Sequence, residues 1–139
     1  MIDINSALLQ AYYEAIDALD IPVYEGEEPD NVAHKIYAVL TNISTTDTST
    51  KNSSDVNATI QVIVNSWDFK YNNSKSLNTA VNQIISAISS SQNNVLDLSD
   101  YGLQMLNLSV NTETQNYGNL DGRIYISRII TFKQDIFII

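Results

Sequence analysis

The chain has 139 residues and no cysteine, so it is long enough to bury one core, and disulfides and thiolate metal sites are excluded. Its formal net charge of −9, from 16 acidic and 7 basic residues, repels phosphate backbones. The apolar runs are too short to span a bilayer, and residues 1–5 lack the start of a signal peptide. We therefore expect one domain, residues 1–139, that is used without secretion.

The first elements predicted along the chain are a helix and a short edge strand. Apolar residues recur at helical spacing over residues 8–19, and Asn5 or Ser6 can cap the first turn. Pro22 disfavours a helical residue before it and so ends the helix. Residues 23–24 are then predicted to form the edge strand.

The middle of the chain predicts two strands and a second helix. Residues 36–43 are apolar at both alternating positions, which indicates a strand covered on both faces. Residues 44–55 are rich in Ser, Thr and Asn and predict a mobile loop or a long hairpin tip. Residues 56–67 alternate strictly, with the even-numbered side chains inward, and residues 74–88 carry apolar side chains on one helical face.

The last third of the chain is predicted to be β structure after a polar exit loop at residues 89–94. Apolar residues alternate over positions 106–110, which indicates a strand. Turn-forming residues gather over 115–122, and a returning strand follows. Arg128 interrupts its inward apolar face, so we expect a β-bulge near Ser127. The whole order favours an α+β fold, a two-layer sandwich in which two main helices pack on a mostly antiparallel sheet.

Five segments follow one another in a distinctive order: Val23-Tyr24, Glu28-Pro29, Ile36-Tyr37-Ala38-Val39-Leu40, Val62-Ile63-Val64-Asn65-Ser66-Trp67 and the helical residues 77–88. Over most of its length the chain thereby resembles the phage tail-terminator (tail-completion, or head–tail joining) family. The resemblance implies a structural virion protein of the neck or tail, which closes into a sixfold or twelvefold ring at the head–tail junction. Its implied partners are a tail-tube protein and a head-connector or stopper protein.

The sequence departs from the family's pattern in places, so the resemblance does not decide between subfamilies. Lys35-Ile36 stands where the family often has a proline before its tyrosine. The chain therefore fits either the cap of a long tail tube or a neck ring in a short-tailed phage.

Two apolar groups are candidate interface residues. Ile63 and Trp67 share the strand face opposite the predicted core, although a loop or helix of the same subunit can also cover them. The segment Ile136-Phe137-Ile138-Ile139 either completes the subunit's own sheet or docks on a neighbour. Because an exposed apolar end is unfavourable in a soluble monomer, we expect a contact with a neighbour or with the tail tube.

An acidic loop supplies a second kind of candidate site. Glu25, Glu27, Glu28 and Asp30 offer oxygen ligands, but their spacing is not that of an EF-hand, so we expect a solvated loop without metal. On the lumen of a ring these charges would repel DNA, which would pass through without specific binding.

The sequence predicts neither catalysis nor a cofactor. His34 is the only histidine, and no motif fixes a nucleophile beside it. The four glycines form no nucleotide-binding loop. We expect a non-enzymatic virion protein without membrane association, assembled in the host cytoplasm. The alternative is a monomeric acidic binding module, an inhibitor or adaptor that recognises a protein partner.

Overall fold

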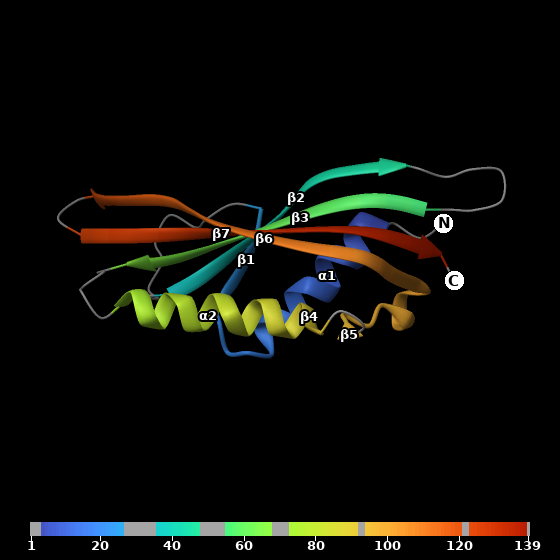
Figure 1. The fold of residues 1–139 in the computed structure, drawn as a ribbon, viewed down its shortest axis with the longest axis horizontal. Helices are drawn as coiled ribbons and strands as arrows, with labels where there is room; N and C mark the ends of the chain where they lie inside the picture. Colours follow the sequence, from blue (N-terminus) through green and yellow to red (C-terminus); the bar gives the residue numbers. More distant parts are fainter. Residues whose placement is uncertain are drawn as a thin grey trace.

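Two helices pack on one face of a five-stranded sheet (Figure 1). The structure, a computed structural model, describes residues 4–26, 36–47, 55–67, 73–91, 94–120 and 123–138. The main elements are α1 (Ile4–Asp17), β1 (Val23–Glu25), β2 (Ile36–Asp47), β3 (Asp55–Trp67), α2 (Asn73–Ile88), β6 (Leu103–Leu120) and β7 (Arg123–Ile138). The strand order is β1-β2-β3-β7-β6, and of the pairs between these strands only β1–β2 is parallel. The predicted α+β sandwich with a mostly antiparallel sheet is confirmed.

The core lies between the helices and one face of the sheet. The even-numbered side chains of β3 point into it, as predicted, and those of Ala58, Ile60, Val62 and Val64 are fully buried. The helices contribute apolar stripes at helical spacing, which include Leu8, Tyr12 and Ile16 of α1 and Leu77, Ile84 and Ile88 of α2. Each fully buried Leu or Ile contributes roughly 1.5–3 kcal/mol of transfer free energy, so this layer holds the sandwich together.

Helix α1 begins before the residues predicted to cap it, Asn5 and Ser6. The helix begins at Ile4, so Asn5 lies inside its first turn. The Asn5 Oδ1 atom instead accepts hydrogen bonds from Asn42 Nδ2 at 3.0 Å and from Thr45 Oγ1 at 2.6 Å. These bonds join the start of α1 to β2.

β2 and β3 form a longer hairpin than the polar composition indicated. Ser44–Asp47 pair with residues 56–59, so part of the predicted loop is strand. Ser44 and Thr45 are exposed and are held here by the backbone ladder, and threonine favours the extended conformation. Residues 48–54 lie outside the described part of the chain. Nearer the centre of the sheet, residues 37–40 are buried on both faces of β2, as predicted.

β6 contains a bulge that the alternation of apolar residues did not reveal. Its register with β7 shifts between Leu106 and Ser109, and Asn107 takes a left-handed backbone conformation with φ of 55°. The extra residue puts Leu106 and Val110 on opposite faces of the sheet. The predicted alternation over residues 106–110 is therefore wrong.

β6 and β7 also form a longer hairpin than predicted. β6 continues to Leu120 and β7 begins at Arg123, so residues 115–120 form strand and not turn. Asp121 and Gly122 separate the two strands and lie outside the described residues. Backbone pairing with β7 therefore overrides the turn preferences of residues 115–120.

Arg128 stays in phase on the helix-covered face of β7. The register of β7 with β3 is continuous through Ser127 and Arg128, and the bulge lies opposite them in β6, between Thr114 and Asn116. The predicted bulge in β7 is thus wrong. The Nη1 atom of the Arg128 guanidinium donates a hydrogen bond to Asn78 of α2.

The chain leaving α2 is not simply the predicted polar loop. β4 (Ser89–Ser91) and β5 (Asn94–Val95) pair with each other, and a short 3-10 helix, η1 (Ser99–Tyr101), precedes β6. The Leu96 N–H donates to the Ile88 carbonyl at 2.7 Å, and the Leu103 N–H donates to the Leu98 carbonyl at 3.2 Å. These bonds hold residues 96–98 against the end of α2 and the start of β6.

Candidate assembly surface

The sheet face opposite the helices carries an apolar row across three strands. Val39, Ile63 and Ile129 are direct neighbours in register on β2, β3 and β7. Val39 and Ile129 are each 6% exposed and Ile63 is half-buried. Both helices lie on the other side of the sheet (Figure 1). Ile63 therefore faces away from the helices, and its role as an interface residue stays a prediction.

For two predicted interface residues, Trp67 and Ile139, the structure describes no side-chain contact. Trp67 is the last residue of β3, where its backbone pairs with Tyr125, and its side chain is outside the described part. Ile139 also lies outside the described residues. Their contacts therefore stay predictions.

The structure of the end of β7 contradicts part of the prediction that residues 136–139 dock on a neighbour. Ile136 is fully buried in the subunit's own core, and its backbone pairs with Val56 on β3 and Met105 on β6. The expected exposed tail was wrong at this position because the strand continues and completes the sheet. Phe137 is half-buried and Ile138 is 48% exposed, so these two remain available for contact.

The acidic loop is described only at its start. Glu25 ends β1 and is exposed. The next residue, Gly26, has φ of +81°, a conformation that favours glycine, and it donates its N–H to the Leu40 carbonyl at 2.9 Å. Glu27, Glu28 and Asp30 lie outside the described residues, as does His34.

β6 is a long edge strand of the sheet. Its 18 residues pair with β7 on one side, and no other described strand of this sheet pairs with it. An unpaired strand edge presents main-chain N–H and C=O groups that can bind another strand. The three large apolar residues exposed among the described ones, Leu106, Val110 and Ile138, all lie in β6 or β7.

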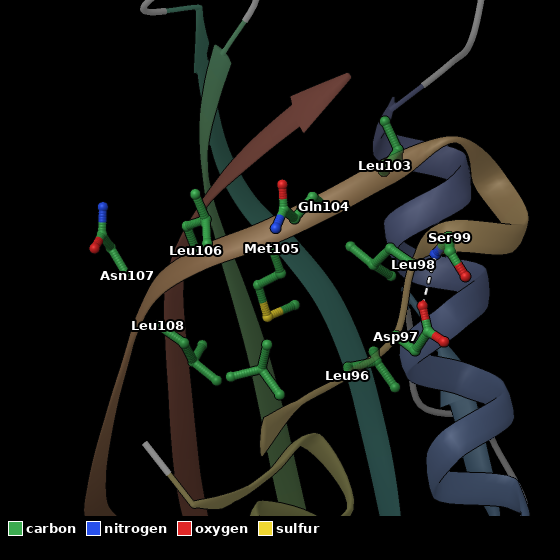
Figure 2. Close-up of a pocket in the computed structure, with 11 residues that line it drawn as sticks. Leu96, Asp97, Leu98, Ser99, Leu103, Gln104, Met105, Leu106, Asn107 and Leu108 are labelled. Carbon is green, nitrogen blue, oxygen red and sulfur yellow. Dashed lines mark hydrogen bonds between the residues drawn. The ribbon is translucent and has the colours of Figure 1, made fainter. Parts of the chain in front are cut away.

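A groove of about 840 Å³ runs between β6 and the segment before it (Figure 2). Figure 2 shows Met105 and Leu108 of β6 facing the segment that carries Leu96 and Leu98. Leu106 also lines the groove and is 41% exposed. Met105 pairs with the buried Ile136 and Leu106 pairs with Asp135, so these two side chains lie on opposite faces of β6.

One acidic residue, Asp97, is among those that line this groove. Asp97 accepts a hydrogen bond from the Ser99 N–H at 2.9 Å; hydrogen bonds from the Ser99 side chain and backbone lower the pKa of that carboxyl. Asp100 is exposed nearby in η1, and Glu14 of α1 accepts a hydrogen bond from the Tyr101 hydroxyl at 3.4 Å. No residue that lines the groove is Lys, Arg or His.

The sequence did not predict this groove. The available signal was the apolar cluster Val95, Leu96 and Leu98 in a polar stretch before β6. Such a cluster is too short to define a helix or strand by periodicity. The bulge at Asn107, which turns Leu106 out of the core, had no sequence signal strong enough to place it.

Within the described ranges, no three His, Asp or Glu side chains come together as metal ligands. No helix in the same part of the chain is long and apolar enough to cross a membrane.

A solved structure shares this fold. It is a chain in the virion of a native gene transfer agent particle, with a TM-score of 0.61 and 14% sequence identity. The match covers 97% of this chain and 99% of that chain, so the two folds correspond from end to end. At this identity the likeness establishes the fold alone. No family model and no curated protein sequence matches the chain.

Proposed function

We propose that this chain is a non-enzymatic structural protein of a tailed phage or phage-like virion, and that it forms a tail-terminator or neck ring at the head–tail junction. The observation that carries the proposal is the end-to-end fold likeness to a chain of a gene transfer agent virion. The order of the five sequence segments adds independent support, because it resembles the tail-terminator family.

Exposed surfaces at the edge and on one face of the sheet support assembly. β6 offers an unpaired edge, and Ile63, Phe137 and Ile138 offer apolar contact area away from the helices or at the end of the sheet. A heterologous contact between copies closes into a ring when the rotation per copy divides a full turn. The proposed ring is sixfold or twelvefold and joins a tail-tube protein to a head-connector or stopper protein.

The charge of the chain supports passage of DNA without binding. A sixfold ring carries six times the formal charge of −9, so a phosphate backbone in its channel would be repelled on average. Glu25, Glu27, Glu28 and Asp30 are the proposed channel-lining acids. Assembly would take place in the host cytoplasm, before the protein becomes part of the virion neck or tail.

Native mass spectrometry tests the ring. The proposed outcome is one closed oligomer of the 15.5 kDa chain, and Ile63→Gln should shift the population toward monomer. Glu113→Gln is the matched control, because Glu113 is exposed on β6 and lies opposite Ile129 in the same row as Ile63. A wild-type chain that stays monomeric at virion-like concentration would instead support the acidic binding module.

A further inference from the structure

Arg128 lies on the helix-covered face of the sheet, where its hydrogen-bond partner is a neutral side chain. It pairs with the buried Val64 of β3, so both side chains lie on the same face. Its Nη1 atom donates to the side chain of Asn78, which is exposed on α2, and its Nε atom is buried without a hydrogen-bond partner. The guanidinium therefore keeps donors for a carboxylate, which arginine binds through two parallel N–H···O bonds.

The helices leave part of β6 uncovered beside Arg128. Val110 and Thr112 pair with buried residues of β7 and so lie on the helix side of the sheet, yet Val110 is 38% exposed and Thr112 is exposed. Ile85 is half-buried and lies on the same flank of α2 as Asn78, two helical turns further along. These five residues form a step with α2 as its wall and β6 as its floor, which we call the Arg128 ledge.

Two exposed carboxylates lie at the opposite edge of the sheet. Asp17 is the last residue of α1, and Asp20 lies in the turn that leads into β1, the edge strand on that side. The Asp20 N–H donates to the Asp17 carbonyl at 3.1 Å, so the two residues belong to one turn. Residues 17–20 are called the acidic turn below.

The acidic turn and the Arg128 ledge lie at the same height along the strands. One row of paired residues crosses the sheet from β1 to the ledge: Val23, Ala38, Val64 and Arg128. Asp20 precedes Val23 by three residues and lines a pocket with residues of α2, so it lies on the helix side of the sheet. The two oppositely charged groups are therefore at the two ends of one row and in the same layer.

We propose that the acidic turn of one copy docks on the Arg128 ledge of the next, where a carboxylate of the turn pairs with Arg128. Leu19, half-buried between the two acids in the sequence, then packs against Val110 and Ile85. This inference rests on the proposed ring and names the subunit contact that closes it. The contact joins two different surfaces, so each copy keeps one of each free until the ring closes.

Local charge selects a second copy for this ledge although the chain is acidic overall. Charges more than about 10 Å apart are largely screened at about 0.1 M salt, so groups in direct contact decide the pairing. A neutral surface on the ledge would leave the guanidinium desolvated and unpaired, which is strongly unfavourable. The acidic turn supplies the missing carboxylate, and every copy in a ring carries one.

Two complementary variants test the contact by native mass spectrometry of the full chain. Arg128→Glu reverses the charge of the ledge. The combined variant Asp17→Lys/Asp20→Asn changes the formal charge of the turn from −2 to +1. Lysine suits the end of a helix, and asparagine tolerates the left-handed φ of 60° at residue 20.

Each variant alone should lose the closed oligomer, with at least about a tenfold rise in the subunit concentration needed for assembly. An equimolar mixture should restore it, because each contact then joins either the two reversed surfaces or the two unchanged ones. The restored oligomer should contain the two variants in equal numbers, which their different masses reveal.

Lys133→Glu is the matched control for the ledge variant. Lys133 is exposed on the same strand but pairs with Thr59 on the opposite face of the sheet. Its reversal should change the assembly concentration by less than about twofold, and its mixture with the turn variant should restore nothing. If Arg128→Glu does not fold, Arg128→Gln keeps a donor for Asn78 without the charge and should also weaken assembly about tenfold.

Three results would overturn this contact while leaving the proposed ring in place. They are closed oligomers that persist in both variants, a mixture that stays dissociated, and equal loss of assembly with Lys133→Glu. A wild-type chain that stays monomeric would contradict the ring and this contact together.

Discussion

At the scale of single residues, one buried polar pair stands out in the core. The Tyr12 hydroxyl donates a hydrogen bond to Gln134 Oε1, and Gln134 Nε2 donates to the Ala58 carbonyl at 2.6 Å. Tyr12 is 0% exposed and Gln134 is 1% exposed. The Tyr12 ring also packs edge-on against Phe132 with centroids 5.3 Å apart. The pair therefore fixes how α1 sits on β7.

A double-mutant cycle measures the value of this pair. Tyr12→Phe leaves the buried Gln134 Oε1 without its donor and should cost about 1–3 kcal/mol of unfolding free energy. Gln134→Met should cost a similar amount because it leaves the Tyr12 hydroxyl unpaired. The double variant should cost less than the sum of the two, since an apolar pair leaves no orphaned group. Urea denaturation gives the three values, and strict additivity would contradict the account.

The same tyrosine predicts a loss of stability in alkali. Burial raises the pKa of the Tyr12 hydroxyl well above its usual value of 10.0. Above about pH 10 the unfolded chain releases this proton while the folded chain keeps it, so the unfolding free energy falls as the pH rises. The slope from this one group approaches about 1.4 kcal/mol per pH unit.

Comparison of wild type with Tyr12→Phe isolates that contribution, because the other seven of the eight tyrosines are common to both proteins. Urea denaturation between about pH 9 and pH 11 should show a shallower decline for the variant. Parallel declines for the two proteins would show that Tyr12 ionises equally in both states.

At the scale of elements, the end of β7 carries one buried and one exposed apolar residue on the same face of the sheet. Ile136 is fully buried, whereas Ile138, on the same face two residues later, is 48% exposed. Ile136→Ala should cost about 2–5 kcal/mol because it leaves a cavity in the core. Ile138→Ala should change the unfolding free energy of the monomer by less than about 0.5–1 kcal/mol. Equal costs would mean that the end of β7 does not pack as described.

The predicted elements show where sequence patterns are sufficient. The alternation in β3 and the helical stripe in α2 were predicted correctly, because each follows one period without interruption over residues 56–67 and 74–88. Residues 44–47 were predicted as a mobile loop or a long hairpin tip, and residues 115–120 as a turn, because their polar composition favours turns. Pairing with an adjacent strand decides the structure of both.

The candidate sites were harder to predict for a different reason. Ile136 was assigned to an interface because an apolar end looks exposed in sequence, but its neighbours Val56 and Met105 come from distant parts of the chain. The groove depends on a single inserted residue at Asn107 and on two backbone hydrogen bonds that hold residues 96–98. Neither long-range pairing nor a one-residue bulge leaves a periodic signal.

At the scale of the whole molecule, the chain has one sheet face covered by helices and one free of them (Figure 1). The two long hairpins extend toward opposite ends of the sheet, the β2–β3 pair at one end and the β6–β7 pair at the other (Figure 1). An elongated subunit of this shape suits the proposed place between two different partners.

Electron microscopy of the purified protein tests this central proposal most directly. The account predicts annular particles with an open central channel and a single rotational order. Ile63→Gln should reduce their number without unfolding the chain. Uniform compact particles the size of one 15.5 kDa subunit, at concentrations where virion proteins assemble, would contradict the proposed ring.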